Sequence, residues 1–243
     1  MKVIVTKDYE EMSREAGKIF IERIREKPEI VLGLATGSTP IGLYNELIRA
    51  HREEGLDFSR VRTFNLDEYV GLSSEDETSY RYFMNDNLFN HINIRPENIS
   101  IPDGRARDLD KFCRDYDQKI EDIGGIDLQL LGIGEDGHIA FNEPGTYLNV
   151  GTNITSLAES TIEVNSRFFD SIDDVPKTAI TLGMGGIMKA KEIVLLANGE
   201  KKSQVIKKLL TEGRVSTELP VSFLLVHPNV TIILDEAAYG GLK

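Results

Sequence analysis

Three acid–base residues stand close together in a glycine-rich stretch of this 243-residue chain. Asp136, His138 and Glu143 lie within eight residues of one another, directly after an apolar run that is typical of a buried strand. An imidazole between two carboxylates can transfer protons near neutral pH, because a carboxylate partner fixes its tautomer. A lone histidine is more often structural, but a histidine flanked by two acids at a strand end favours proton transfer.

The same stretch contains a formal G-x-G-x-x-G pattern at Gly132, Gly134 and Gly137. In dinucleotide-binding proteins this pattern opens a helix, and an acidic residue about 20 positions further on binds the ribose. Here Pro144 and Gly145 interrupt the segment early, and the acidic residue near that distance lies in a Ser/Thr-rich stretch. We therefore reject a dinucleotide site.

Two adjacent carboxylates, Asp67 and Glu68, directly follow another apolar run. Side chains alternate along an extended chain, so the two cannot face the same way. One of them can point into a site as a general base while the other makes structural hydrogen bonds. The alternative is a helix-capping aspartate in a solvated loop.

A third apolar run leads into Gly37, Ser38 and Thr39, followed by Pro40 at the expected first position of a helix. Free backbone N–H groups and two hydroxyls at a helix amino terminus are suited to binding phosphate. The run lacks the Lys of a P-loop. The alternative is that Thr39 only caps the helix and Gly37 only permits the turn.

Basic side chains that could join a phosphate site are Arg167, in the run NSRFF, and Lys202, in ANGEKKS. Lys201 and Lys202 both approach the start of another predicted helix. Charged side chains are usually solvated, so these positions are singled out only by the phosphate argument.

Short apolar runs that are typical of strands alternate with helical patterns along the whole chain. The expected strands are Val3–Val5, Ile30–Ala35, Val61–Leu66, Ile99–Ile101, Leu128–Ile133, Ile193–Ala197 and Thr231–Leu234. The expected helices are 9–24, 41–48, 78–91, 107–122, 179–189 and 201–211. This alternation predicts one α/β domain over residues 1–243, with a mostly parallel, open, Rossmann-like sheet and helices on both faces. In such sheets ligands bind beyond the carboxyl ends of the strands, where the candidate residues stand.

Composition narrows the possible partners and the compartment. The formal charge of −12 argues against nucleic acid and anionic membranes as partners. The single Cys113 excludes a disulfide framework, and the four dispersed histidines predict no metal site. No signal peptide or membrane span is indicated, so we expect a cytoplasmic protein.

Taken together, these segments resemble the glucosamine-6-phosphate deaminase (isomerase) family. The resemblance covers essentially the whole chain, and GHIAFNEPG following NLDEYVGL is highly specific. The matching runs are LATGSTPIGLY, FNLDEYVGL, LLGIGEDGHIAFNEPG, SRFF, AITLGMGGIMKAKEIVLLANGEKK and LPVSFLLVHPN.

The resemblance implies conversion of D-glucosamine 6-phosphate and water to D-fructose 6-phosphate and ammonia, without a cofactor. It implies that Asp67 moves the proton from C2 towards C1 and that His138 opens the pyranose ring, tuned by Asp136 and Glu143. It also implies phosphate ligands, namely Gly37, Ser38, Thr39, Arg167 and Lys202, with Lys201 as the alternative to Lys202.

Two other functions share parts of this pattern. The related 6-phosphogluconolactonases have a Gly-x-Asp-Gly-His core but usually lack the FNEPG run that follows His138 here. A non-catalytic sugar-phosphate sensor would usually carry an added binding domain. Because the chain stops at Gly240–Lys243, soon after the last predicted strand, we expect a monomer or low-order homo-oligomer without allosteric activation by N-acetylglucosamine 6-phosphate.

Overall fold

A seven-stranded parallel sheet forms the centre of the computed structural model, which describes residues 1–240 apart from the side chains of Ser160 and Phe168. The strand order is β1-β10-β9-β6-β2-β3-β5, and neighbouring strands pair in parallel throughout. The strands are β1 (Lys2–Thr6), β2 (Val31–Leu34), β3 (Arg62–Asn65), β5 (Ile99–Ser100), β6 (Leu128–Leu131), β9 (Glu192–Ala197) and β10 (Val230–Asp235). Each corresponds to a predicted strand, so the fold class is confirmed.

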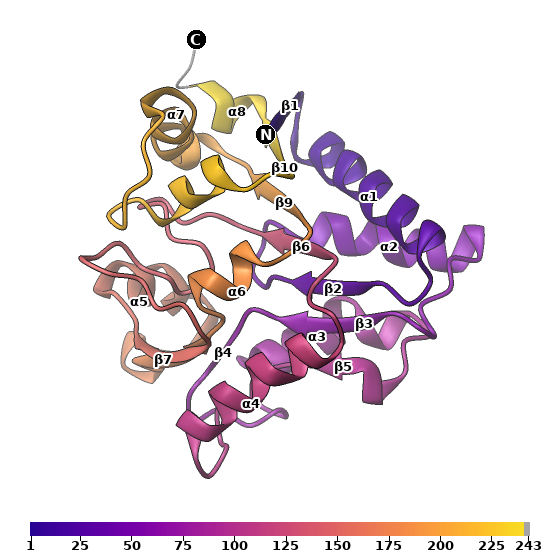
Figure 1. Ribbon diagram of the computed structural model, residues 1–243, viewed down its shortest axis with the longest axis horizontal. Helices are drawn as coiled ribbons and strands as arrows, with labels where there is room; N and C mark the ends of the chain where they lie inside the picture. The colour runs from indigo at the N-terminus through magenta and orange to yellow at the C-terminus, as the bar shows by residue number, and fades with distance from the viewer. Residues whose placement is uncertain (241–243) are drawn as a thin grey trace.

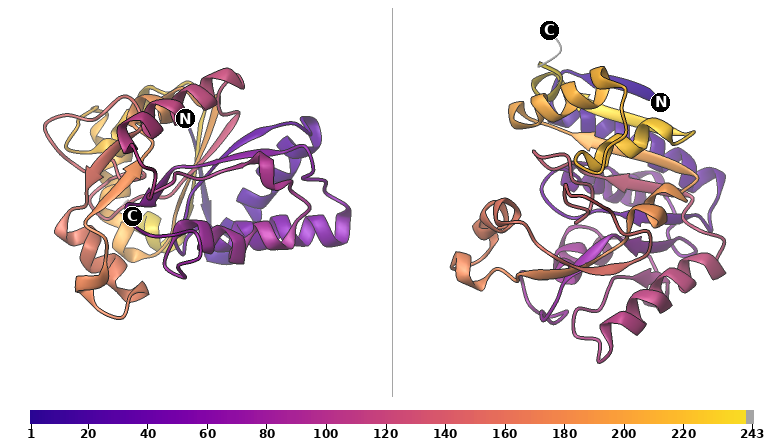
Figure 2. Two further views of the ribbon diagram at one scale, coloured as in Figure 1. Left: turned by 90° about the horizontal axis from the view of Figure 1, so that it is seen from below. Right: turned by 60° about the vertical axis from the view of Figure 1, so that its left-hand side comes forward.

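Helices cover both faces of this sheet (Figure 2). The α-helices are α1 (Tyr9–Glu26), α2 (Ile41–Glu54), α3 (Tyr80–Asn87), α4 (Leu109–Asp122), α5 (Glu159–Asn165), α6 (Met184–Met188), α7 (Ser203–Glu212) and α8 (Glu236–Tyr239). The 3-10 turns are η1 (Phe89–His91), η2 (Pro96–Asn98), η3 (Ser166–Phe168), η4 (Ile172–Asp174), η5 (Glu200–Lys202) and η6 (Pro220–Val226). Within residues 1–240, no helix is both long and apolar enough to cross a membrane.

A second, smaller sheet stands beside the carboxyl ends of the large one (Figure 1). It consists of three antiparallel strands in the order β4-β8-β7, namely β4 (Asp67–Tyr69), β8 (Thr178–Thr181) and β7 (Asn153–Ser156). The prediction of a helix over 179–189 is therefore wrong in its first part, because Ala179–Thr181 pair with β4 and β7. Only Met184–Met188 are helical there.

Local sequence explains where the first helix begins and what it buries. The Asp8 side chain accepts a hydrogen bond from the Glu11 N–H at 2.9 Å and so caps α1. Met12, Ala16, Phe20 and Ile24 recur at helical spacing and are at most 2% exposed. This apolar face packs against α2 and β10. The opposite face remains polar.

The strand order reverses next to β2. From β2 the chain proceeds through β3 to β5 on one side, whereas β6, β9, β10 and β1 lie on the other side. The neighbours β2 and β6 therefore flank the topological switch point, which is where sheets of this kind bind their ligands. This is the edge at which the sequence places its candidate residues.

Candidate active site

His138 lies between two carboxylates in the loop after β6. Its Nδ1 is 2.8 Å from Asp136 Oδ1 and 3.4 Å from Glu143 Oε2. Among the described residues, neither contact has the alignment of a hydrogen bond. The attraction between the imidazole and the two carboxylates is therefore mainly one between opposite charges. Because Nδ1 faces both acids, Nε2 points to the opposite side of the ring and is available to a substrate.

The two acids keep His138 protonated. Burial alone would lower the pKa of His138, but the contacts and charges of Asp136 and Glu143 raise it to about 9. Burial alone would also raise the pKa of Asp136, yet its contact with His138 holds that pKa well below its usual range. At neutral pH a positively charged His138 therefore lies beside a negatively charged Asp136.

The backbone of this loop passes very close to the side chains of His138 and Asp136. A Cβ on Gly134 would lie 2.3 Å from the His138 ring and 2.6 Å from Asp136 Oδ1, so only glycine fits there. Gly137 has φ of +94°, and Ala140 has φ of +52°, a left-handed conformation that costs a non-glycine residue roughly 1–2 kcal/mol. The Asn142 side chain holds the turn by donating to the carbonyls of Ile139 and Leu182, each at 3.0 Å.

Asp67 and Glu68 face different surroundings, as the alternation of side chains predicts. The Glu68 carboxylate accepts hydrogen bonds from the backbone N–H groups of Tyr69, Tyr80 and Arg81 at 2.9–3.0 Å. It thus ties β4 to the start of α3, which confirms that one of the two acids is structural. Asp67 has no such anchoring and is 6% exposed.

The surroundings of Asp67 make it a weak acid. Burial is the strongest influence and, together with the negative charge of Glu68, raises the pKa of Asp67 to about 7, while His138 opposes this rise. The charge of His138 is thus near enough to influence the Asp67 carboxyl group. A carboxylate with a pKa near the working pH is well suited to general-base chemistry.

An aromatic cluster encloses this part of the site. The rings of Tyr69, Tyr80, Phe141 and Phe169 contact one another at centroid distances of 4.8–6.1 Å. They come from β4, α3, the loop after His138 and the segment after α5. Tyr69 and Phe141 are buried in this cluster, and such an apolar environment strengthens the electrostatic interactions beside it.

The loop after β2 is anchored at several points. Thr39 Oγ1 donates to Asn198 Oδ1 at 2.9 Å, joining this loop to the one after β9. The Tyr9 hydroxyl donates to the Ser38 carbonyl at 3.1 Å and accepts from the Gly42 N–H at 2.8 Å. Pro40, not Thr39, occupies the N-cap of α2 and makes no side-chain cap. The capping alternative for Thr39 is therefore wrong, and Pro40 precedes the helix by one residue.

Lys202 and Arg167 approach the site from two other segments. Burial lowers the pKa of Lys202; Glu135 and Asp136 oppose this, and the nearby positive charge of Arg167 adds to it. The two basic groups are thus electrostatic neighbours, as two ligands of one anion would be. Lys201 is 83% exposed at its side chain and lies 3.9 Å from Glu135, so it faces solvent.

Judged only by the distances between their ligand atoms, His138 and its two acidic neighbours could bind a cation. One ligand atom each from Asp136, His138 and Glu143 lies within 4.8 Å of the others. A metal would have to displace the proton of His138, however, and the pKa of about 9 opposes this displacement at neutral pH. The donor set is better suited to proton transfer than to metal binding.

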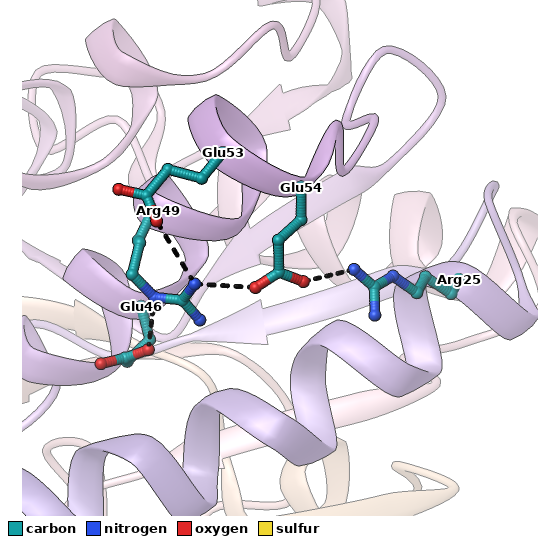
Figure 3. A network of polar contacts seen from close by, with 5 residues as sticks. All are labelled: Arg25, Glu46, Arg49, Glu53 and Glu54. Atoms are coloured by element: carbon teal, nitrogen blue, oxygen red, sulfur yellow. Dashed lines mark hydrogen bonds and ion pairs between the residues drawn. The ribbon is translucent and has the colours of Figure 1, made fainter.

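A hollow of about 700 Å³ on the α1–α2 surface is a poor rival site. Its Arg25 and Arg49 are paired with carboxylates, including Glu54 at 2.5 Å and 2.7 Å (Figure 3). Such exposed, neutralised pairs leave little charge for a ligand. The strand ends therefore remain the candidate site.

Several residues of the site escaped prediction. Tyr9 and Asn198 hold the loop after β2, and Thr161 donates to Glu143 Oε1 at 2.6 Å. Each acts across a large sequence separation and belongs to no motif with a local signature. Only the Ser/Thr-rich character of residues 152–161 hinted at hydroxyl partners.

The sheet topology and the paired acid–histidine set define a Rossmann-like α/β protein with a site equipped for acid–base chemistry. Residues 7–233 match the family of glucosamine-6-phosphate isomerases and 6-phosphogluconolactonases. The chain belongs to this family.

Its relatives extend over the full chain. Glucosamine-6-phosphate deaminases of Clostridium perfringens (strain SM101 / Type A) and Clostridium beijerinckii are 59% and 54% identical, each covering 100% of both chains. The structure of a monomeric glucosamine-6-phosphate deaminase superposes with a TM-score of 0.97 at 48% identity, covering 99% of this chain and 100% of the other. The 6-phosphogluconolactonase of Trypanosoma brucei shares the fold, with a TM-score of 0.79 at 21% identity over 100% and 98%.

Proposed function

We propose that this enzyme converts D-glucosamine 6-phosphate and water to D-fructose 6-phosphate and ammonia. Full-length identity of 59% to a deaminase supports this reaction over lactone hydrolysis. The lactonase structure that shares the fold is only 21% identical to this chain. The observation that carries the proposal is the presence of a buried carboxylate, Asp67, at the same sheet edge as His138, which lies between the carboxylates of Asp136 and Glu143. Aldose–ketose chemistry on a closed sugar needs such a pair.

His138 opens the ring in this proposal. The C1–O5 bond breaks, O5 takes a proton from Nε2, and the proton of the O1 hydroxyl returns to the imidazole as C1 becomes an aldehyde. Asp136 and Glu143 stabilise the imidazolium before the transfer and hold the ring in place. One residue can serve both oxygens because it gives a proton and then regains one.

Asp67 acts next. The aldehyde acidifies C2. The Asp67 carboxylate removes the C2 proton while the His138 imidazolium, which regained a proton during ring opening, returns one to O1, and this gives an enolamine. Return of a proton to C1 leaves an imine at C2. Water adds to C2 and ammonia leaves, which yields the ketose. The isomerisation consists of proton transfers and the final step is hydrolysis of the imine, with no net oxidation or reduction, so the proposal requires no cofactor and no electrophilic metal.

The phosphate group lies, in this proposal, between the loop after β2 and the two basic side chains. Gly37, Ser38 and Thr39 supply N–H groups and hydroxyls at the start of α2, and Arg167 and Lys202 supply positive charge. Lys202 is favoured over Lys201 because it is half-buried next to Arg167, whereas Lys201 is exposed. These local donors outweigh the repulsion of a chain with net charge −12.

The direct test is release of ammonia from glucosamine 6-phosphate, measured with and without EDTA. We expect equal turnover in both conditions. Hydrolysis of 6-phosphogluconolactone without ammonia release would favour the lactonase alternative. Binding of the sugar phosphate without turnover would favour the sensor. Loss of activity in EDTA, restored by a divalent cation, would contradict the purely acid–base route.

The proposed oligomeric state is based on the similarity of this chain to a solved structure. A deaminase structure described as monomeric is 48% identical to this chain, and we propose a monomer or low-order homo-oligomer here. A cytoplasmic location remains the expectation set by the single Cys113. The expected lack of allosteric activation was based on Gly240–Lys243, of which 241–243 lie outside the described residues.

A further inference from the structure

Glu143 is held by a hydroxyl from a different segment of the chain. Thr161, the third residue of α5, donates from Oγ1 to Glu143 Oε1 at 2.6 Å. Thr161 is 5% exposed, so this hydrogen bond is protected from water. The other oxygen, Oε2, has no hydrogen bond among the described residues and lies 3.4 Å from His138 Nδ1. One oxygen of Glu143 is therefore fixed by Thr161, and the other faces the imidazole.

The segment that carries Thr161 also carries Arg167. The helix α5 ends at Asn165 and continues without a break into η3, which includes Arg167. Arg167, whose guanidinium is expected at the substrate phosphate, thus lies six positions after Thr161, whose hydroxyl contacts Glu143. Arg167 is in turn an electrostatic neighbour of Lys202.

Apolar packing holds α5 and the residues on either side of it together as one unit. Leu157 before α5, Ile162 within it and Phe169 after it all pack in the small apolar cluster with Tyr69 and Phe141. Phe141 stands two residues before Glu143, and Tyr69 two residues after Asp67. A shift of α5 therefore cannot leave the carboxylate undisturbed.

We propose that Thr161 is a positioning residue for ring opening, and that it couples phosphate binding at Arg167 to the orientation of Glu143. When Arg167 contacts the phosphate, α5 is held in place, and Thr161 keeps Glu143 Oε2 directed at His138. Without the hydroxyl, Glu143 can rotate away and His138 loses one of its two acidic partners. This inference rests on the proposed function.

The test uses Thr161→Val, which keeps the side-chain shape and removes the donor. A hydrogen bond to a charged group stabilises by roughly 1.5–3 kcal/mol, so we expect kcat to fall about 10- to 100-fold. We expect KM to change less than about threefold, because the phosphate ligands remain. Thr161→Ser should recover most of kcat, and Thr161→Ala should behave as Thr161→Val does. The matched control is Thr211→Val on the exposed end of α7, which should leave kcat unchanged.

Two double-mutant cycles separate positioning from a general structural role. In a Glu143→Gln background, Thr161→Val should have little further effect on the enzyme-catalysed interconversion of the α and β anomers, followed by NMR. Arg167→Ala should slow this interconversion at saturating substrate in the parent and slow it less in Thr161→Val. These patterns are expected only if Thr161 acts through Glu143 and transmits the effect of Arg167.

Distinct results overturn the inference. Turnover of Thr161→Val within threefold of the parent, or a defect confined to KM, would exclude the positioning role. Additive effects with Glu143→Gln would show that Thr161 acts elsewhere, and additive effects with Arg167→Ala would exclude the coupling. If the parent itself releases no ammonia from glucosamine 6-phosphate, the proposed function fails instead, and the parent enzyme alone shows which of the two is wrong.

Discussion

Asp67 and His138 have pKa values shifted in a way that leaves both groups in their active forms over the same pH range. Asp67 must lose its proton to act as a base, so kcat/KM should rise with pH through about 7. His138 must hold its proton to protonate O5, so kcat/KM should fall through about 9. We predict a bell-shaped profile with its maximum near pH 8, measured between pH 5 and 10. An acidic limb near pH 4, the ordinary range of a carboxyl group, would contradict the assignment of Asp67.

The raised pKa of Asp67 also has a consequence for stability. Its pKa is about 7 in the folded chain and about 3.9 in the unfolded chain, so the unfolded chain loses its proton first as pH rises. The free energy of unfolding therefore falls between about pH 4 and pH 7. Asp67→Asn removes this cost and should stabilise the fold by about 2–4 kcal/mol at pH 8 and hardly at all at pH 4.

Urea unfolding at both pH values measures this effect. The control is Asp110→Asn, an exposed change on α4 that should alter the free energy of unfolding by less than about 0.5 kcal/mol at either pH. Equal midpoints of the parent and Asp67→Asn at pH 8 would show that the Asp67 carboxylate is not destabilising when charged. A gain in stability with a loss of activity is the usual signature of a functional residue.

At the scale of the structural elements, the conformation of the loop after β6 requires a glycine at position 134. Gly134→Ala would place a methyl group 2.3 Å from the His138 ring, and His138 would have to move away from Asp136. We predict that kcat falls at least about 100-fold, in the range of a lost general acid–base group. Gly132→Ala is the matched control, because its Cβ would meet nothing within 4 Å, and its effect should be far smaller. Similar activity in the two variants would contradict this geometry.

The central strands of the large sheet, β2, β6, β9 and β10, could be predicted because each is a mostly apolar run that is buried on both faces. The segment Ile193–Ala197, for example, has no residue above 1% exposure. The small sheet escaped prediction for the opposite reason. β4 has three residues with two charges, and β7 alternates intermediate and exposed positions. β4 also pairs with β8, at Asp67 and Thr181 for example, which lie 114 positions apart in the sequence, so no local pattern reveals the pairing.

The candidate site was predictable to the extent that its residues end strands. Asp67 follows β3, and Asp136 and His138 follow β6, so the parallel sheet alone brings them to one edge. What could not be predicted is the second layer that holds them. Thr161 and Tyr9 reach the site through helices whose tertiary placement no spacing in the sequence reveals.

For the whole molecule, we predict a single chain of 27.2 kDa or a small oligomer in solution, together with hyperbolic saturation by glucosamine 6-phosphate. The basis is the 48% identical structure that is described as monomeric. Light scattering and initial rates, with and without N-acetylglucosamine 6-phosphate, measure both properties. A hexamer, or a Hill coefficient clearly above one that falls when this sugar is added, would contradict the prediction.

The division of work between Asp67 and His138 is the central claim, and hydrogen exchange at C2 tests it most directly. In D₂O, NMR should show that Asp67→Asn slows exchange of the C2 proton by about 10²–10⁴, the cost of losing a general base, while anomer interconversion continues. His138→Gln should slow anomer interconversion instead. If Asp67→Asn exchanges the C2 proton within about threefold of the parent, Asp67 is not the base, and the account of the site is wrong.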